Sequence, residues 1–333
     1  MGRVLDHERE RLARYKATSL CFSEAARADG YYMGKPRSFC LPRANAAENL
    51  YSAIREQAIE AFQESSIPWH SGRDGNPSNH LCDSQVCCVN FLFPFANRPD
   101  ELLKLLAPLF LDMRAMLPME RGQYVAFEWI GKSDYLGERP RGKRTRGANT
   151  TSADAAVMIE RTDGSRQIVL IEWKYIESYG RTFKRYSSSG TDRAAIYDPL
   201  FQRDDCWLDK DVLSNYDALF YEPFYQFMRQ QLLAHEMEKA KELGADVVSL
   251  LHLAPTYNTD FQRVTSPTLV DVGASVTEVW SRLVRVPDRF ASVSVESLFR
   301  EYARQMAPDM EPWWAYLTGR YNWLTFEGTR DTP

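Results

Sequence analysis

An apolar segment at residues 168–175 constrains the fold more than any other feature of the sequence. It reads Ile-Val-Leu-Ile-Glu-Trp-Lys-Tyr, a composition typical of a buried β-strand. A second strand is predicted at residues 154–160, and the pair Asp163-Gly164 between the two segments is typical of a tight turn. The two segments therefore predict a β-hairpin that lies in the interior of the protein.

The chain before this hairpin is predicted to be mainly helical. Apolar residues at three- and four-residue spacing predict helices at residues 44–63, 84–93 and 100–117. We expect a kink at Pro108 in the last of these, because proline interrupts helical hydrogen bonding. A strand is predicted at residues 124–130, directly ahead of the hairpin.

After the hairpin, the helical spacing returns at residues 223–243, and Gly244 is placed to end that helix. A buried strand is predicted at 246–254. The order helix, three strands, helix, strand predicts an α/β core.

The two flanks are predicted to pack on this core in one compact unit. We expect a helical N-terminal extension at residues 1–100, the core at 101–260 and a C-terminal extension at 261–333, with short helices at 279–284 and 294–305. Aromatic residues of the tail are expected to pack against the core and not to stack on bases: Trp313, Trp314, Tyr316, Tyr321 and Trp323.

Charged residues at the end of the apolar strand indicate a metal-binding or catalytic site. Glu172 and Lys174 lie on one face of the strand, because side chains alternate between faces. Burying such a pair costs several kcal/mol unless a metal ion, a partner or water compensates. Folding about the Asp-Gly turn brings Asp154 toward Glu172. Two carboxylates at one point favour a hard cation such as Mg²⁺, and a neighbouring lysine can orient water or neutralise charge on a phosphate.

This pattern resembles the active site of the restriction-endonuclease-like PD-(D/E)XK nuclease superfamily. Asp154 and Glu172-Trp173-Lys174 carry the resemblance, which spans roughly residues 101–255. It implies a restriction-endonuclease-like αβββαβ core, with a mixed central sheet flanked by helices and helical additions at both ends. It also implies that Asp154 and Glu172 hold Mg²⁺, which Mn²⁺ can replace, and that Lys174 assists the water that attacks a DNA phosphodiester. Ala153 stands where the family usually has proline, and residues 177–222 form an insertion without an assigned role.

Further site residues are suggested by the same resemblance. Many members add an acid from an element ahead of the aspartate, for which Glu128 and Glu48 are both candidates. The helix after the lysine often supplies polar groups, and Gln226 and Gln230 lie four residues apart on one face, with Arg229 beside them. A solvated helix face is the alternative interpretation of these glutamines.

Two basic clusters bracket the acidic residues and predict contacts with phosphates, with a solvated loop as the alternative. The predicted contact residues are Arg139, Arg141, Lys143, Arg144, Arg146, Lys184 and Arg185. The net charge of −4 argues against general coating of nucleic acid but permits a local basic groove.

Several other classes of protein are disfavoured. The six cysteines are sparse and are expected to be reduced thiols in a cytoplasmic protein, and no apolar run approaches the length of a membrane span. No Gly-rich phosphate loop occurs, so ATP binding is not expected. Zinc binding is the alternative for the cluster His70, His80, Cys82, Cys87 and Cys88, whose spacing fits no standard zinc pattern.

The sequence thus predicts a Mg²⁺-dependent nuclease that hydrolyses DNA, with a role in restriction, phage defence or repair. The alternative is a non-catalytic nucleic-acid-binding or assembly module that retains the nuclease fold. The sequence does not determine whether the substrate is DNA or RNA, or whether cleavage is internal or at a terminus. It also leaves open whether the protein is a monomer or a homodimer.

Overall fold

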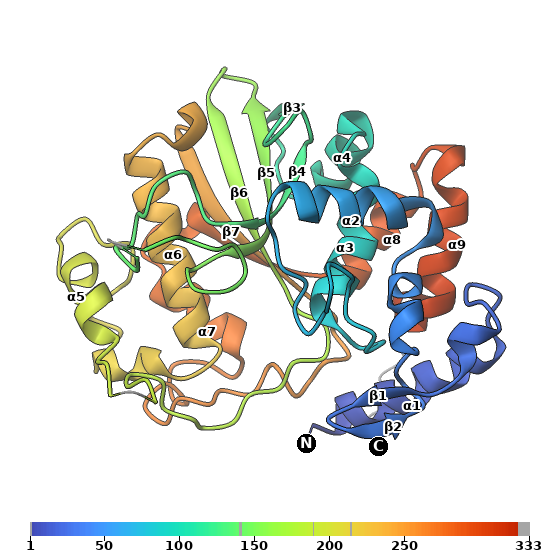
Figure 1. The fold of residues 1–333 in the computed structure, drawn as a ribbon. Coiled ribbons are helices and arrows are strands. Elements are labelled where there is room, and N and C mark those ends of the chain that lie inside the picture. The colour runs from blue at the N-terminus through green and yellow to red at the C-terminus, as the bar shows by residue number, and fades with distance from the viewer. Residues whose placement is uncertain (1, 140–141, 189, 214, 326–333) are drawn as a thin grey trace.

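A mixed β-sheet forms the centre of the computed structural model, which describes residues 2–139, 142–188, 190–213 and 215–325 (Figure 1). Its strands are β3 (Met113–Leu117), β4 (Val125–Trp129), β5 (Ala153–Arg161), β6 (Arg166–Trp173), β7 (Val247–Ala254) and β8 (Phe290–Ser294). The order across the sheet is β3-β5-β6-β7-β8, and β4 also pairs with β5. A separate two-stranded sheet joins β1 (Gly30–Tyr32) and β2 (Lys35–Arg37).

The predicted hairpin is confirmed as β5 and β6, which pair in antiparallel register. Gly164 adopts a φ of 84° in the turn, a conformation that glycine accepts without strain. Ser165 stabilises the turn by donating from its backbone nitrogen and its Oγ to Asp163 Oδ1, at 2.8 and 2.6 Å. Strand β7 then returns parallel to β6, after a helical crossover.

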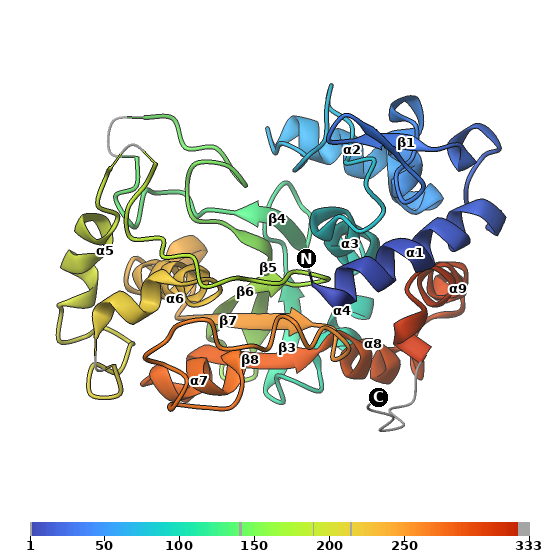
Figure 2. The same cartoon turned by 90° about the horizontal axis from the view of Figure 1, so that it is seen from below.

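Helices cover both faces of the sheet (Figures 1 and 2). They are α1 (Arg3–Thr18), α2 (Arg55–Glu64), α3 (Ser84–Leu92), α4 (Pro99–Leu106), α5 (Ala194–Phe201), α6 (Phe224–Lys239), α7 (Val276–Leu283), α8 (Val295–Ala303) and α9 (Glu311–Arg320). Helices α5, α6 and α7 lie on one side of the sheet, and α3, α4, α8 and α9 lie on the other. The prediction of an α/β protein with a mixed sheet flanked by helices is therefore confirmed.

The core on the α3 side draws on the whole length of the chain. Buried side chains of β5 and β6 pack there with residues as far apart as Leu12 and Leu324. The aromatic tail packs in this core as predicted, because Trp313, Tyr316 and Trp323 are buried in it and Trp314 packs against it. The predicted division at residues 100 and 260 stays a prediction, since this core includes side chains from all three proposed parts.

Two predicted helices are wrong in part. Residues 44–63 form two short 3₁₀ helices, Arg43–Asn49 and Ser52–Ile54, before α2 begins. The chain breaks after Asn49 because its backbone oxygen accepts from Asn90 and Arg320 and not from a following helical turn. The helix predicted at 100–117 ends with α4, because the segment that becomes β3 pairs with the end of β5.

Other predicted elements lie close to their observed bounds, but the sequence analysis did not predict β8. That strand is a short one at the edge of the sheet, parallel to β7. Within the described ranges, no helix combines the length and apolarity needed to cross a membrane. The six cysteines are free thiols, of which Cys21 alone is exposed.

Candidate active site

Three acidic residues lie on neighbouring strands at one end of the sheet. Ala155 pairs with Ile171, so the next position of the register places Asp154 opposite Glu172. On the other side of β5, Phe127 pairs with Ala155 and Trp129 with Ala153, which places Glu128 beside Asp154. Directly opposed residues share a face of the sheet, so the structure brings the predicted Asp154 and Glu172 together.

Lys174 completes this group from the end of β6. Its Nζ donates to Glu172 Oε1 and, at 2.8 Å, to Gln226 Oε1. Asp154 Oδ2 accepts from the backbone nitrogen of Trp173 at 2.7 Å, which ties the aspartate to the same strand. Glu172 is fully buried and Lys174 is 3% exposed, so both charges are removed from bulk water.

The electrostatics of this group show an excess of negative charge. Burial raises the pKa of Asp154 well above its ordinary value, and the neighbouring charge of Glu172 raises it further. Burial alone would lower the pKa of Lys174, but Glu172 and the other nearby acids hold it above its ordinary value. One buried cation therefore faces two acids of the sheet, and the ionised form of Asp154 lacks a counter-charge.

Helix α6 supplies both predicted glutamines to the group. Gln230 is buried, and its Nε2 donates to Glu172 Oε2 and, at 3.1 Å, to the backbone oxygen of Ser152. Gln226 contacts Lys174 as described. The face of α6 that carries these residues thus points at the carboxylates and is not the solvated face of the alternative interpretation.

Glu128 is held in place by residues of α3, of the loop before α3 and of the segment before β5. Its carboxylate accepts from Gln85 Nε2 at 2.8 Å and from Ser152 Oγ at 2.9 Å, and His70 Nε2 lies 3.5 Å from Oε1. The backbone of Glu128 has a φ of 48°, the left-handed region that non-glycine residues rarely adopt. Burial raises the pKa of this carboxyl group, although His70 opposes the shift.

Of the two candidate acids, the structure places Glu128 near the group, and its role in the site stays a prediction. Glu48 accepts from Ser23 and Asn45, away from the strands that carry the other acids. Sequence analysis missed the roles of His70 and Gln85 beside Glu128, because only the tertiary fold brings them there.

His252 is a further neighbour that the sequence analysis missed. It lies opposite Glu172 on β7 and is fully buried. Its Nδ1 lies 3.0 Å from Ser292 Oγ, and burial together with the charge of Lys174 lowers its pKa to about 3. The imidazole is therefore neutral at physiological pH and adds no positive charge to the group.

Some of the basic residues predicted to contact phosphates are bonded to other parts of the protein, and others are exposed. Arg144 donates to the backbone oxygens of residues 130–133, Arg146 pairs with Glu120 at 2.6 Å, and Arg185 pairs with Asp192 and Asp217. Lys143 is exposed, and Arg141 lies outside the described residues. The phosphate contacts of this set stay a prediction, and the three engaged arginines already have protein partners.

A cleft of about 630 Å³ is lined by residues of α5 and α6 and of nearby loops, and neither Asp154 nor Glu172 lines it. Its cationic lining residues are Arg139, Lys184, Arg193 and Arg229, and the acids Glu138 and Glu222 also line it. Arg229 precedes Gln230 on α6, donates to Thr151 Oγ1 at 3.2 Å and lies over the ring of Tyr225 at 4.6 Å. Its buried Nε has no hydrogen-bond partner among the described residues.

The alternative zinc cluster does not come together as a ligand set. Cys82, Cys87 and Cys88 are buried, and burial raises their thiol pKa values well above normal. The ring of His80 accepts from the backbone nitrogen of Cys82. No group of three or more His, Cys, Asp or Glu side chains suited to a metal ion occurs in the described part of the chain.

Comparison with known proteins places the chain in a family. No curated protein and no solved structure matches the chain. One family model, described as restriction endonuclease associating with ARP, matches residues 9–322 and so covers both extensions as well as the sheet. The chain therefore belongs to this family, which confirms its resemblance to restriction endonucleases.

Proposed function

We propose that the protein is a Mg²⁺-dependent nuclease that hydrolyses phosphodiester bonds of DNA. The observation that carries the proposal is the opposition of Asp154 and Glu172 at the end of the hairpin, with Lys174 bonded to Glu172. The description of the family supports a nuclease, and it favours a role in restriction over one in repair.

The side chains present fit a magnesium ion. Mg²⁺ in proteins is commonly bound through one or two carboxylates, with water and substrate phosphate completing its shell, so a third protein ligand is not needed. The raised pKa of Asp154 indicates that its ionised form lacks a counter-charge, which a bound cation would supply. Asp154 and Glu172 would hold the ion, and the bound ion would polarise the phosphate and lower the pKa of an attacking water.

The chain's own groups have separate tasks in this proposal. Lys174 places an ammonium group beside the carboxylates, where it offsets negative charge that develops on the phosphate. Gln230 fixes the second oxygen of Glu172, and Gln226 fixes Lys174. Glu128 has a positioning role in this proposal. Its carboxylate accepts from Gln85 and from Ser152, and so helps to fix the segment that leads into the Asp154 strand.

The cleft beside α6 is the proposed path of the nucleic acid next to the scissile phosphate. Arg229 and Arg193 lie over the ring of Tyr225, at 4.6 and 5.9 Å, and both residues line the cleft. Guanidinium groups bind phosphates in a planar, directional manner. Lys184 and Arg139, both predicted from the sequence, line the same cleft.

Cleavage of linear, circular and single-stranded DNA in Mg²⁺, Mn²⁺ or EDTA tests the proposal, with an RNA of the same sequence as a fourth substrate. We expect metal-dependent cleavage that falls at least about 100-fold in Asp154→Asn. The matched control is Asp112→Asn, an exposed carboxylate near the opposite end of β5, which should cleave like the wild type. If the wild type binds DNA but cuts none of these substrates, the non-catalytic module replaces the nuclease.

A further inference from the structure

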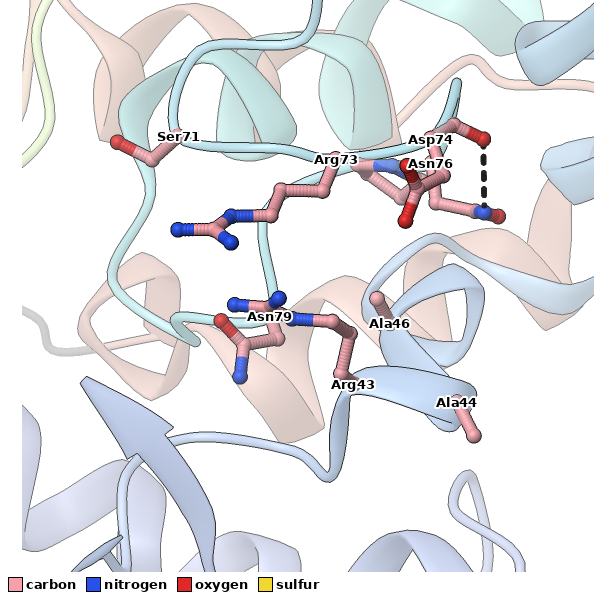
Figure 3. Close-up of a pocket in the computed structure, with 9 residues that line it drawn as sticks. Arg43, Ala44, Ala46, Ser71, Arg73, Asp74, Asn76 and Asn79 are labelled. Atoms are coloured by element: carbon pink, nitrogen blue, oxygen red, sulfur yellow. Dashed lines mark hydrogen bonds between the residues drawn. The ribbon is translucent and has the colours of Figure 1, made fainter. Parts of the chain in front are cut away.

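A second cationic hollow lies on the N-terminal extension, outside the cleft described above. Its volume is about 200 Å³, and its lining includes Arg43, Ser71, Arg73, Asp74 and Asn79. Figure 3 shows that the side chains of Arg43 and Arg73 come from opposite walls and that both guanidinium groups end near Asn79.

The walls of this hollow are fixed to one another by hydrogen bonds. Asn79 Nδ2 donates to the backbone oxygen of Leu41 at 2.7 Å, and the backbone nitrogen of Leu41 donates to the backbone oxygen of Asn79 at 2.8 Å. Asn49 Nδ2 donates to the backbone oxygen of Ser78 at 2.6 Å. The segment that carries Arg43 is thereby tied to the loop that carries Arg73, and the spacing of the two arginines is built into the fold.

Neither arginine has an acidic partner within the part of the chain that the structure describes. Both side chains are exposed, whereas Arg146 and Arg185 are engaged in ion pairs. Asp74 lines the same hollow without pairing with either arginine. Two like charges that face one hollow repel each other, and an anion between them would remove that repulsion. Paired guanidinium groups with an amide and a hydroxyl nearby suit a phosphate group.

The hollow is connected to the active site by a very short stretch of chain. Ser71 lines the hollow, and the preceding residue, His70, lies 3.5 Å from Glu128. The Cα atoms of His70 and Arg73 can be at most about 11 Å apart, because three residues cannot span more. In Figure 2 the N-terminal elements lie on one side of β4 and the loops that line the α6 cleft lie on the other.

We propose that Arg43 and Arg73 bind a backbone phosphate of the DNA a few nucleotides from the scissile bond. The proposal deepens the nuclease function and rests on it for the identity of the polymer. The N-terminal extension would then hold the DNA on the β4 side of the carboxylates, opposite the Arg193 and Arg229 cleft.

Binding of a labelled duplex to Arg43→Gln/Arg73→Gln, measured in Ca²⁺ over a series of salt concentrations, tests the proposal. Each phosphate contact contributes about 0.9 to the slope of log affinity against log salt, so loss of this one contact in the double variant should lower the slope by about 0.9. The matched control is Arg114→Gln, an exposed arginine on β3 near the far end of the sheet, which should leave the slope unchanged.

The assay separates this site from the nuclease proposal. A reduced slope supports the phosphate site even if the wild type fails to cleave, whereas an unchanged slope overturns it even if the wild type cleaves. Titration with inorganic phosphate, followed by thermal unfolding, distinguishes a free anion from DNA. If phosphate stabilises the wild type but not the double variant while the DNA slope stays unchanged, the hollow binds a free anion and the assignment to DNA is wrong.

Discussion

Charged side chains lie on both faces of the chain at the end of β6, and the two groups differ in their balance of acids and bases. On one face, Lys174 and Glu172 meet Asp154, and acids outnumber bases. On the other face, Tyr175 donates to Glu8 at 2.5 Å, and Arg11 pairs with the same carboxylate at 2.6 Å. Arg11 also donates to the backbone oxygen of Arg320, so one acid and one base satisfy each other and their neighbours.

This contrast shows that neighbouring residues of one strand end, Lys174 and Tyr175, can belong to a candidate site and to a structural contact, respectively. The ion pair of Glu8 and Arg11 lies within α1, and its contacts with the Tyr175 hydroxyl and the backbone oxygen of Arg320 hold this helix against the end of the sheet and against α9. Ionising an acid without a buried counter-charge costs free energy, and the cation proposed above would lower that cost. The predictions below compare Lys174 with Arg11 because each is the base of its own group.

The largest expected effect is on cleavage. Lys174→Met keeps the aliphatic bulk but removes the charge beside the phosphate, so cleavage should fall by about 10²- to 10³-fold while DNA binding in Ca²⁺ changes little. Arg11→Met should cleave at the wild-type rate per folded molecule. Single-turnover cleavage, normalised to the folded fraction, measures both, and equal losses in the two variants would abolish the distinction between the groups.

Stability should separate the same two variants. Removing the base from a buried ion pair typically costs about 3–5 kcal/mol, so both variants should unfold at lower denaturant in EDTA. Mg²⁺ should restore much of the loss in Lys174→Met, because the ion replaces the missing positive charge next to Glu172, but none of the loss in Arg11→Met. Urea unfolding with and without Mg²⁺ measures this, and restoration of Arg11→Met would show that Mg²⁺ acts elsewhere.

A smaller effect is expected from the support of Glu128. Gln85→Leu removes the amide that donates to Glu128 Oε1 at 2.8 Å, and loss of such a supporting contact commonly costs about 10-fold in activity. The effect should appear in cleavage rate and not in the salt dependence of DNA binding. Gln63→Leu, on the exposed face of α2, is the control that should leave both unchanged.

The smallest effect is on the pH dependence of stability. Because the pKa of Asp154 is raised by folding, the native state retains a proton that the unfolded state loses near pH 3.8. The stability that Asp154 contributes is therefore greatest below that pH and declines as the pH rises through the native pKa. The difference in unfolding free energy between wild type and Asp154→Asn should show this decline in EDTA, and Mg²⁺ should flatten it. A difference that rises with pH would contradict the assigned shift.

The sheet and the central acids could be predicted because they depend on local patterns. The hairpin is specified by apolar residues on both sides of an Asp-Gly turn, and the alternation of side chains alone placed Glu172 and Lys174 together. The segment that forms β3 was mispredicted as helix because Met113, Ala115 and Leu117 are good helix formers, and pairing with β5 outweighs that preference. The alternation in β8 covers only five residues, Phe-Ala-Ser-Val-Ser, which is too short to distinguish an edge strand from a loop.

The surroundings of the acids could not be predicted because they depend on contacts distant in sequence. The register of β4 on β5 selects Glu128 over Glu48, and no short pattern encodes that register. The sequence suggests that Arg144 and Arg146 are accessible charges. In the structure, Arg144 donates to backbone oxygens and Arg146 donates to Glu120. Arg43 and Arg73, thirty residues apart, give no sequence signal of a shared hollow.

The wide spacing of the groups that support the carboxylates has a consequence for biosynthesis. Gln85 holds Glu128 and Gln230 holds Glu172, so 145 residues must be added between the first support and the last. At a translation rate of about 5–20 residues per second, this interval lasts about 7–30 s. A nascent chain can close its hairpin during that time, but Glu172 lacks the support of Gln230 until α6 has left the ribosome and docked. Under the nuclease function proposed above, the cell would meet the full activity of the protein only after that step.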